Sequence, residues 1–126
     1  MASPASRREL VLMLTLNELS DDYENLTVSI MPDFDRIAED YRITVEKSEV
    51  ADALKELVEL GWAKAYLPRS GELVEVEGMP FVEDLDGPDG AWFYITDAGR
   101  KVQNEYDAWP WDGEGGIRKD WTPPED

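Results

Sequence analysis

The N-terminal part of the chain carries its densest apolar pattern, in residues 10–19. Seven of these ten positions are apolar: Leu10, Val11, Leu12, Met13, Leu14, Leu16 and Leu19. A helix with this pattern is apolar on most of its circumference, so we expect it to be buried on more than one side. Residues 21–25 end it. Residues 26–30 alternate apolar and polar side chains, which predicts a short strand that Pro32 ends.

Helical spacing returns twice in the next thirty or so residues. The second helix is predicted through Tyr41 with Asp33 as its N-cap, and its apolar residues are Phe34, Ile37, Ala38 and Tyr41. For the third helix we expect Thr44 as the N-cap, Glu46 in the first turn and Gly61 as a left-handed C-terminal residue. Its inward stripe is predicted to be Val50, Ala53, Leu54, Leu57 and either Val58 or Leu60.

The pattern in the second half of the chain predicts strands separated by turns, followed by one more helix. Strands are predicted over 62–67, 72–77 and 91–95, with turns at 68–71 and 84–90. Thr96 is the expected N-cap of a last helix that continues to about Ala108. The predicted organisation is therefore a loose arm (1–7), one domain (8–108) and an irregular tail rich in Trp, Pro and Gly (109–126).

Two pieces of this pattern resemble the winged helix-turn-helix superfamily of bacterial and archaeal transcriptional regulators. They are the helix that ends at Leu60-Gly61 with its strand pair, and the strand that enters Thr96-Asp97-Ala98-Gly99-Arg100. The resemblance implies an α+β fold with a three-helix core, an extended β-wing and a C-terminal helix. The third helix of such domains enters the DNA major groove. It would present Lys47, Ser48, Asp52 and Lys55 as a DNA-reading face here.

The charge of the chain argues against that use of the fold. Asp and Glu number 29 against 12 Lys and Arg, a formal net charge of -17, and no Lys or Arg occurs between Ser70 and Gly99. Because neutralisation of phosphates supplies most non-specific DNA affinity, such a wing would repel DNA. We therefore predict an acidic regulatory or protein-interaction module with weak or no autonomous DNA binding.

An alternative reading is a sequence-specific DNA-binding regulator, for example from a halophile, in which salt screens the acidic surface. In that case the reading face would contact bases, and Arg7, Arg8 or Arg42 would contact phosphates.

Catalytic and metal chemistry find little support in the sequence. The chain has no cysteine and no histidine, which excludes disulfides, thiolate zinc sites and imidazole-based acid–base catalysis. The segment Asp84 to Gly90 clusters three Asp residues as a calcium loop does, but the spacing of an EF-hand is missing, so we expect an acidic turn. The prediction is a protein that is not an enzyme and has no cofactor or metal.

Protein partners are the remaining expectation. The candidate contact residues are three glutamates of the predicted wing and three tryptophans of the tail: Glu72, Glu75, Glu77, Trp109, Trp111 and Trp121. The tryptophans either pack on the protein itself, including a second subunit, or contact an external partner. The first helix either lies in the centre of the monomer or joins the last helix at a two-fold interface. The second is preferred, so a homodimer is expected. No stretch is long and apolar enough to span a membrane, and a cytoplasmic location is expected.

Overall fold

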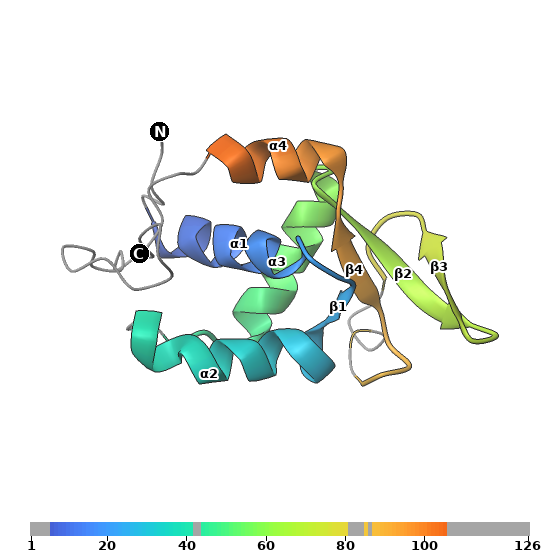
Figure 1. Cartoon of the computed structure of the whole chain (residues 1–126), viewed down its shortest axis with the longest axis horizontal. Coiled ribbons are helices and arrows are strands. Elements are labelled where there is room, and N and C mark those ends of the chain that lie inside the picture. Colours follow the sequence, from blue (N-terminus) through green and yellow to red (C-terminus); the bar gives the residue numbers. More distant parts are fainter. Residues whose placement is uncertain (1–5, 42–43, 81–84, 86, 106–126) are drawn as a thin grey trace.

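The computed structural model describes residues 6–41, 44–80, 85 and 87–105, and these form an α+β fold. Figure 1 shows the helices gathered at one end of a small antiparallel sheet, with one hairpin extending away from them. The predicted tail, with Trp109, Trp111 and Trp121, lies outside the described residues, as do residues 1–5 of the predicted arm.

Helix α1 (Arg7–Glu18) lies in the centre of the helical part, between α2 and α4 (Figure 1). The Ser6 Oγ atom accepts a hydrogen bond from the Glu9 N–H at 3.1 Å and caps the helix. Every residue from Leu10 to Leu16 is buried, so the prediction of a helix buried on more than one side is confirmed.

The strand predicted over 26–30 is wrong. Strand β1 is only Glu24–Asn25, and Leu26–Ile30 forms a wide helical turn (η1) that runs directly into α2 (Met31–Tyr41). The physical reason is a cap that competes with the strand pattern: Asn25 Oδ1 accepts hydrogen bonds from the Thr27 and Val28 N–H groups. Asp33, the predicted N-cap, instead lies inside α2 and forms an ion pair with Arg36.

Helix α3 (Lys47–Glu59) starts two residues later than a Thr44 cap would allow. Its N-cap is Glu46, whose N–H donates to the Glu49 carboxylate at 3.0 Å. The predicted stripe of Val50, Ala53, Leu54 and Leu57 is buried; Val58 is half-buried and Leu60 is exposed. Gly61 has a φ of 79°, which confirms the left-handed end of the helix.

The sheet has the strand order β1-β4-β2-β3, with every neighbouring pair antiparallel. Its other strands are β2 (Ala63–Arg69), β3 (Glu72–Val76) and β4 (Trp92–Ile95). The turn predicted at 68–71 is narrower, because Pro68 and Arg69 pair within β2 and only Ser70 and Gly71 connect the strands. Both have positive φ, 53° and 83°, as a tight two-residue hairpin requires.

Thr96 caps helix α4 (Asp97–Glu105), as predicted, and also ties this helix to the end of α3. The Thr96 hydroxyl donates to the Gly61 carbonyl oxygen at 2.7 Å and accepts from the Gly99 N–H at 3.1 Å. A side chain at Gly99 would collide with the Trp62 carbonyl oxygen, so the close approach of α4 requires glycine there. Within the described residues, no helix is long and apolar enough to cross a membrane.

Glu18, the last residue of α1, is a half-buried carboxyl group in an acidic setting. Burial raises its pKa to about 7, and the negative charges of Glu24 and Asp21 add to the shift while Arg36 opposes it. The pKa of Glu18 in the folded protein lies above its value in the unfolded chain. Its contribution to the free energy of unfolding is therefore fully present below about pH 4.5 and is lost as the pH rises through about 7.

Replacing Glu18 with Gln removes the ionisation and should raise the free energy of unfolding by about 2 kcal/mol at alkaline pH. In acid, where Glu18 is protonated, the same substitution should have little effect. Urea unfolding followed by circular dichroism across this pH range measures both values. The matched control is Glu59→Gln on the exposed side of α3, and an equal gain in that control would contradict the assignment to Glu18.

Candidate protein-interaction surfaces

The predicted DNA-reading residues do lie on the exposed surface of α3. Ser48, Asp52 and Lys55 are exposed and share one side of the helix by their spacing, with Lys47 exposed at its start. The helix also carries Glu46, Glu49, Glu56 and Glu59, so acids outnumber lysines on it by five to two when Asp52 is included.

A groove of about 630 Å³ lies between the N-terminal part of α1 and the exposed side of α3. Arg7 on α1 donates two hydrogen bonds to the Glu49 carboxylate, at 2.8 and 2.9 Å, and a third to the Thr44 carbonyl oxygen at 2.6 Å. The bonds from Arg7 to its carboxylate lower the pKa of Glu49. Arg8 pairs with Glu56 at 2.8 Å. Both arginines that the DNA-binding alternative assigns to phosphates are thus engaged with carboxylates of α3, while Arg42 lies outside the described residues.

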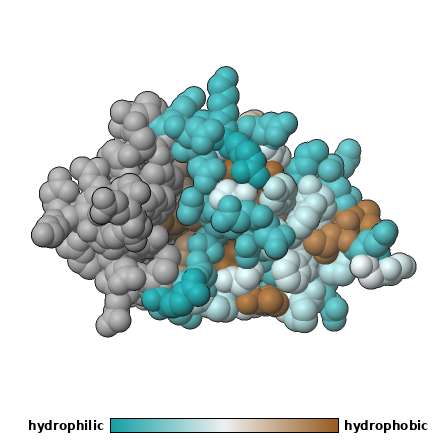
Figure 2. Space-filling model, in the orientation of Figure 1, coloured by the Kyte–Doolittle hydropathy of each residue, from teal (hydrophilic) through white to brown (hydrophobic). Residues whose placement is uncertain are grey.

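Two of the predicted glutamates, Glu72 and Glu75, lie on the outer strand β3 of the β2–β3 hairpin, and Glu77 follows that strand. Glu72, Glu75 and Glu77 are exposed, and Glu75 faces Lys64 across the strands at 3.3 Å. Among the described residues, strand β3 pairs only with β2, and no described strand covers its other edge. Between the glutamates, Leu73 is 37% and Val74 45% exposed, and Figure 2 shows hydrophobic surface on this projecting part. The hairpin therefore combines an unpaired strand edge, apolar side chains and carboxylates.

The face of the sheet opposite Phe93 and Ile95 is aromatic. Strand alternation directs Phe93 and Ile95 into the core and leaves Trp92 and Tyr94 half-buried on the other face. Tyr23 completes this face: its ring lies 5.0 Å from the rings of both Tyr66 and Tyr94, perpendicular to the first and tilted 32° to the second.

Sequence reasoning placed Trp92 and Tyr94 on a strand but missed Tyr23 and Tyr66 as their neighbours. The missing information was strand pairing, because β2 meets β4 with Tyr66 opposite Trp92, and β1 meets β4 beside Tyr23. Tyr66 belongs to the apolar and aromatic run over 62–67 that predicted a strand, and this was the one local signal available. No pattern of local spacing identifies Tyr23, because β1 is only two residues long.

A second groove, of about 430 Å³, lies beside this aromatic face. It is bounded by the residues before β1, the tip of the hairpin and the loop before β4. The lining residues are Asp22, Tyr23, Pro68, Gly71, Glu72, Leu73, Pro88 and Trp92. We call this the Tyr23–Trp92 groove.

Comparisons with known proteins leave the family open. No protein-family model matches the chain, and no curated protein matches it either. Among solved structures, smu.1704 from Streptococcus mutans UA159 is similar, with 17% sequence identity and a TM-score of 0.48, over 83% of this chain and 78% of that one.

Asn25 holds one wall of the groove in place from beneath the surface. Its side chain is fully buried, and its amide Nδ2 donates to the Gly87 and Ala91 carbonyl oxygens, each at 2.9 Å. Thr27 adds a further link, because its hydroxyl oxygen accepts from the Gly87 N–H at 2.6 Å. The loop that carries Pro88 and leads into Trp92 is thereby anchored to the start of η1.

Among the described residues, no three Asp or Glu side chains come together as a metal site would require, although Asp84 and Asp86 of the predicted acidic turn lie outside them. Gly87 to Gly90 does form a turn, closed by a hydrogen bond of 3.0 Å from the Gly90 N–H to the Gly87 carbonyl oxygen.

Replacing Asn25 with Asp should lower the free energy of unfolding by about 3 kcal/mol near neutral pH. The carboxylate still accepts the capping bonds but faces two carbonyl oxygens without a proton to donate, and its charge is buried. Urea unfolding measures the change, with the exposed Asn104→Asp as control, which should shift stability by less than about 0.5 kcal/mol. Equal effects of the two substitutions would contradict the anchoring role.

Proposed function

We propose that this chain is a non-enzymatic, acidic module of the winged-helix type that binds a basic surface of another protein through its β2–β3 hairpin. The winged-helix part of the proposal is supported by the order of elements. Helices α1, α2 and α3 are followed, through Gly61, by the hairpin, and β4 returns to pair with β1.

The observation that carries the function is the composition of the open strand β3. An unpaired strand edge offers backbone hydrogen bonds to an extended segment, which is how many domains bind peptides. Leu73 and Val74 add apolar contact area, and Glu72, Glu75 and Glu77 favour a partner with positive charge. Two chains pairing through this edge would bring glutamates together, so charge favours a different, basic partner.

The ion pairs between α1 and α3 support the same choice over DNA binding. Arg7 and Arg8 neutralise Glu49 and Glu56 within the protein, so contact with phosphates would require these pairs to break. On α3, the remaining DNA contacts would rest on Lys47 and Lys55, which lie among acidic residues. The alternative of a DNA-binding regulator keeps the exposed face of Ser48, Asp52 and Lys55 in its favour.

The test is a titration of the full chain with a soluble repeat peptide of arginine and threonine, followed by calorimetry. The proposal expects the triple variant Glu72→Gln, Glu75→Gln, Glu77→Gln to bind this peptide about tenfold more weakly than the natural chain. Double-stranded DNA is titrated in parallel, at low and at molar salt.

A control variant with the same change in net charge separates a local effect from a diffuse one. Asp35→Asn, Glu59→Gln and Glu105→Gln neutralise exposed carboxylates on α2, α3 and α4. This control should bind within about twofold of the natural chain because surface charges far from an interface contribute little. Equal weakening of both variants would refute binding at the hairpin. Tight DNA binding at molar salt would support the DNA-binding alternative instead.

A further inference from the structure

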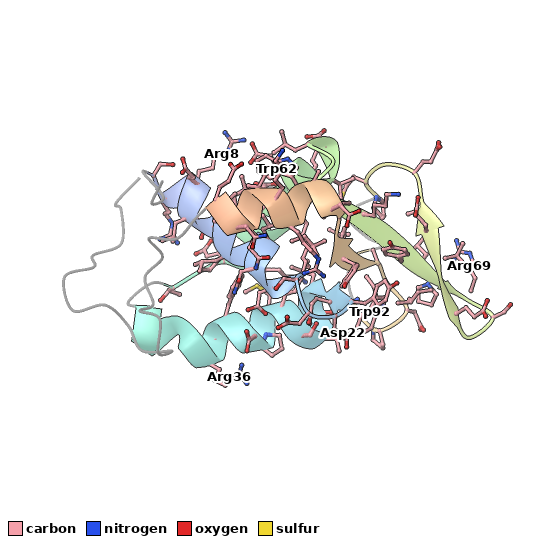
Figure 3. The ribbon with its side chains drawn as sticks, turned by 45° about the horizontal axis from the view of Figure 1, so that its top comes forward. Arg8, Asp22, Arg36, Trp62, Arg69 and Trp92 are labelled. Carbon is pink, nitrogen blue, oxygen red and sulfur yellow. The ribbon has the colours of Figure 1, made fainter. Side chains whose placement is uncertain are left out.

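The Tyr23–Trp92 groove joins two kinds of chemistry at one place. Its aromatic side chains are Tyr23 and Trp92, and its carboxylates are Asp22 and Glu72, which belong to the segment before β1 and to the hairpin. Figure 3 shows the side chains of Asp22 and Trp92 in the same region of the molecule. Pro68, Leu73 and Pro88 complete apolar walls.

The aromatic walls are held in fixed positions. The Trp92 indole N–H donates to the Pro88 carbonyl oxygen at 3.1 Å, which orients the ring. Tyr23 is packed against Tyr66 and Tyr94 with both ring centroids at 5.0 Å. A ligand that enters the groove therefore meets rings that need little further ordering, which reduces the entropic cost of binding.

The charges of the groove are not balanced from within. Within the described part of the chain, no Lys or Arg lines it, and neither Asp22 nor Glu72 forms an ion pair. The nearest candidate in sequence, Arg69, donates to the Pro68 carbonyl oxygen at 3.1 Å, and Figure 3 shows it away from Asp22 and Trp92.

The same aromatic cluster already binds one cation of the chain itself. The Arg100 guanidinium carbon lies 5.7 Å from the centre of the Tyr94 ring, and its Nη2 donates to the Tyr94 hydroxyl oxygen at 2.8 Å. Cations are attracted to aromatic faces at this range. Tyr94 thus contacts Arg100, whereas Tyr23 and Trp92 line a groove to which no described residue contributes a cation.

We propose that the Tyr23–Trp92 groove receives an arginine or lysine side chain from an extended basic segment of the partner protein. The cationic group lies against the aromatic rings, and Asp22 and Glu72 neutralise it. This inference rests on the proposed function, because the segment that adds to the hairpin edge delivers the side chain. It specifies that one basic residue of the partner is an anchor and that the others contribute general charge attraction.

The experiment titrates the full chain with the arginine–threonine repeat peptide while the indole N–H resonances are followed by two-dimensional NMR. The Trp92 resonance is identified by its absence in Trp92→Phe. We expect it to shift with the same saturation curve as the calorimetric binding. A peptide in which citrulline replaces arginine keeps the shape, removes the charge and should bind about tenfold or more weakly.

Variants test the two kinds of contact separately. Trp92→Leu removes the aromatic face and should weaken the arginine peptide about tenfold, whereas Trp92→Phe retains a ring and should stay within about threefold of the natural chain. Asp22→Asn should weaken binding about threefold, and the matched Asp35→Asn on α2 should leave it unchanged. Circular dichroism confirms that each variant is folded.

The outcomes separate this inference from the proposed function. If peptide binding weakens in the triple glutamate variant but is unchanged by Trp92→Leu, and the Trp92 resonance does not shift, the groove is refuted and the hairpin site stands. Sensitivity to Trp92→Leu and to Glu72→Gln, without sensitivity to a double variant of the two glutamates outside the groove, Glu75→Gln and Glu77→Gln, would support the groove and overturn the hairpin site. A Trp92 resonance that moves on dilution without peptide would show a second copy of the chain in the groove and refute a basic partner there.

Discussion

The arrangement of the candidate surfaces depends on the buried side chain of Asn25. A polar group with no access to water must form its hydrogen bonds inside the protein, and this amide does so with both of its ends. Its oxygen caps η1 and turns the chain into α2, while its nitrogen holds the carbonyl groups of Gly87 and Ala91. One residue thus joins the helical part to the loop before β4, and so determines where Trp92 stands relative to Tyr23.

The two faces of the sheet follow from this arrangement. The small side chains of Ala63 and Ala65 let β2 approach the helices. Phe93 fills the space between the sheet and the helices. On the opposite face the same strands present large aromatic rings that cover one another only in part. The hairpin continues beyond the helices, so Leu73 and Val74 have no core to enter and remain exposed. Exposed apolar surface on an unpaired strand is costly for an isolated protein, which is why it points to a binding surface.

Sequence patterns predicted the helices and most strands because each has a strong local signal. The apolar run of α1, the stripe of α3 with Gly61 and the run of aromatic and β-branched residues in β4 each exceed the competing local patterns. The failure at residues 26–30 has a specific cause. Alternation favoured a strand, but Asn25 caps η1, and its side chain is also bonded to the distant Gly87 and Ala91 carbonyl oxygens. The Tyr23–Trp92 groove was out of reach for the same reason, since its walls come from three segments that are brought together by strand pairing.

Net charge alone gives a misleading description of this protein. The formal charge of -17 suggests uniform repulsion of anions, yet the α1–α3 groove is close to neutral because Arg7 and Arg8 pair with its glutamates. The hairpin together with Glu77 carries Lys64 and Arg69 against Glu72, Glu75 and Glu77, so its excess of negative charge is only one. What distinguishes the surfaces is therefore local geometry. Carboxylates beside fixed aromatic rings select a cation by shape as well as by charge, whereas scattered acids only repel phosphate. In the proposed function, specific recognition of a basic partner would therefore rest on the groove, and the acidity of the rest of the surface would add long-range attraction.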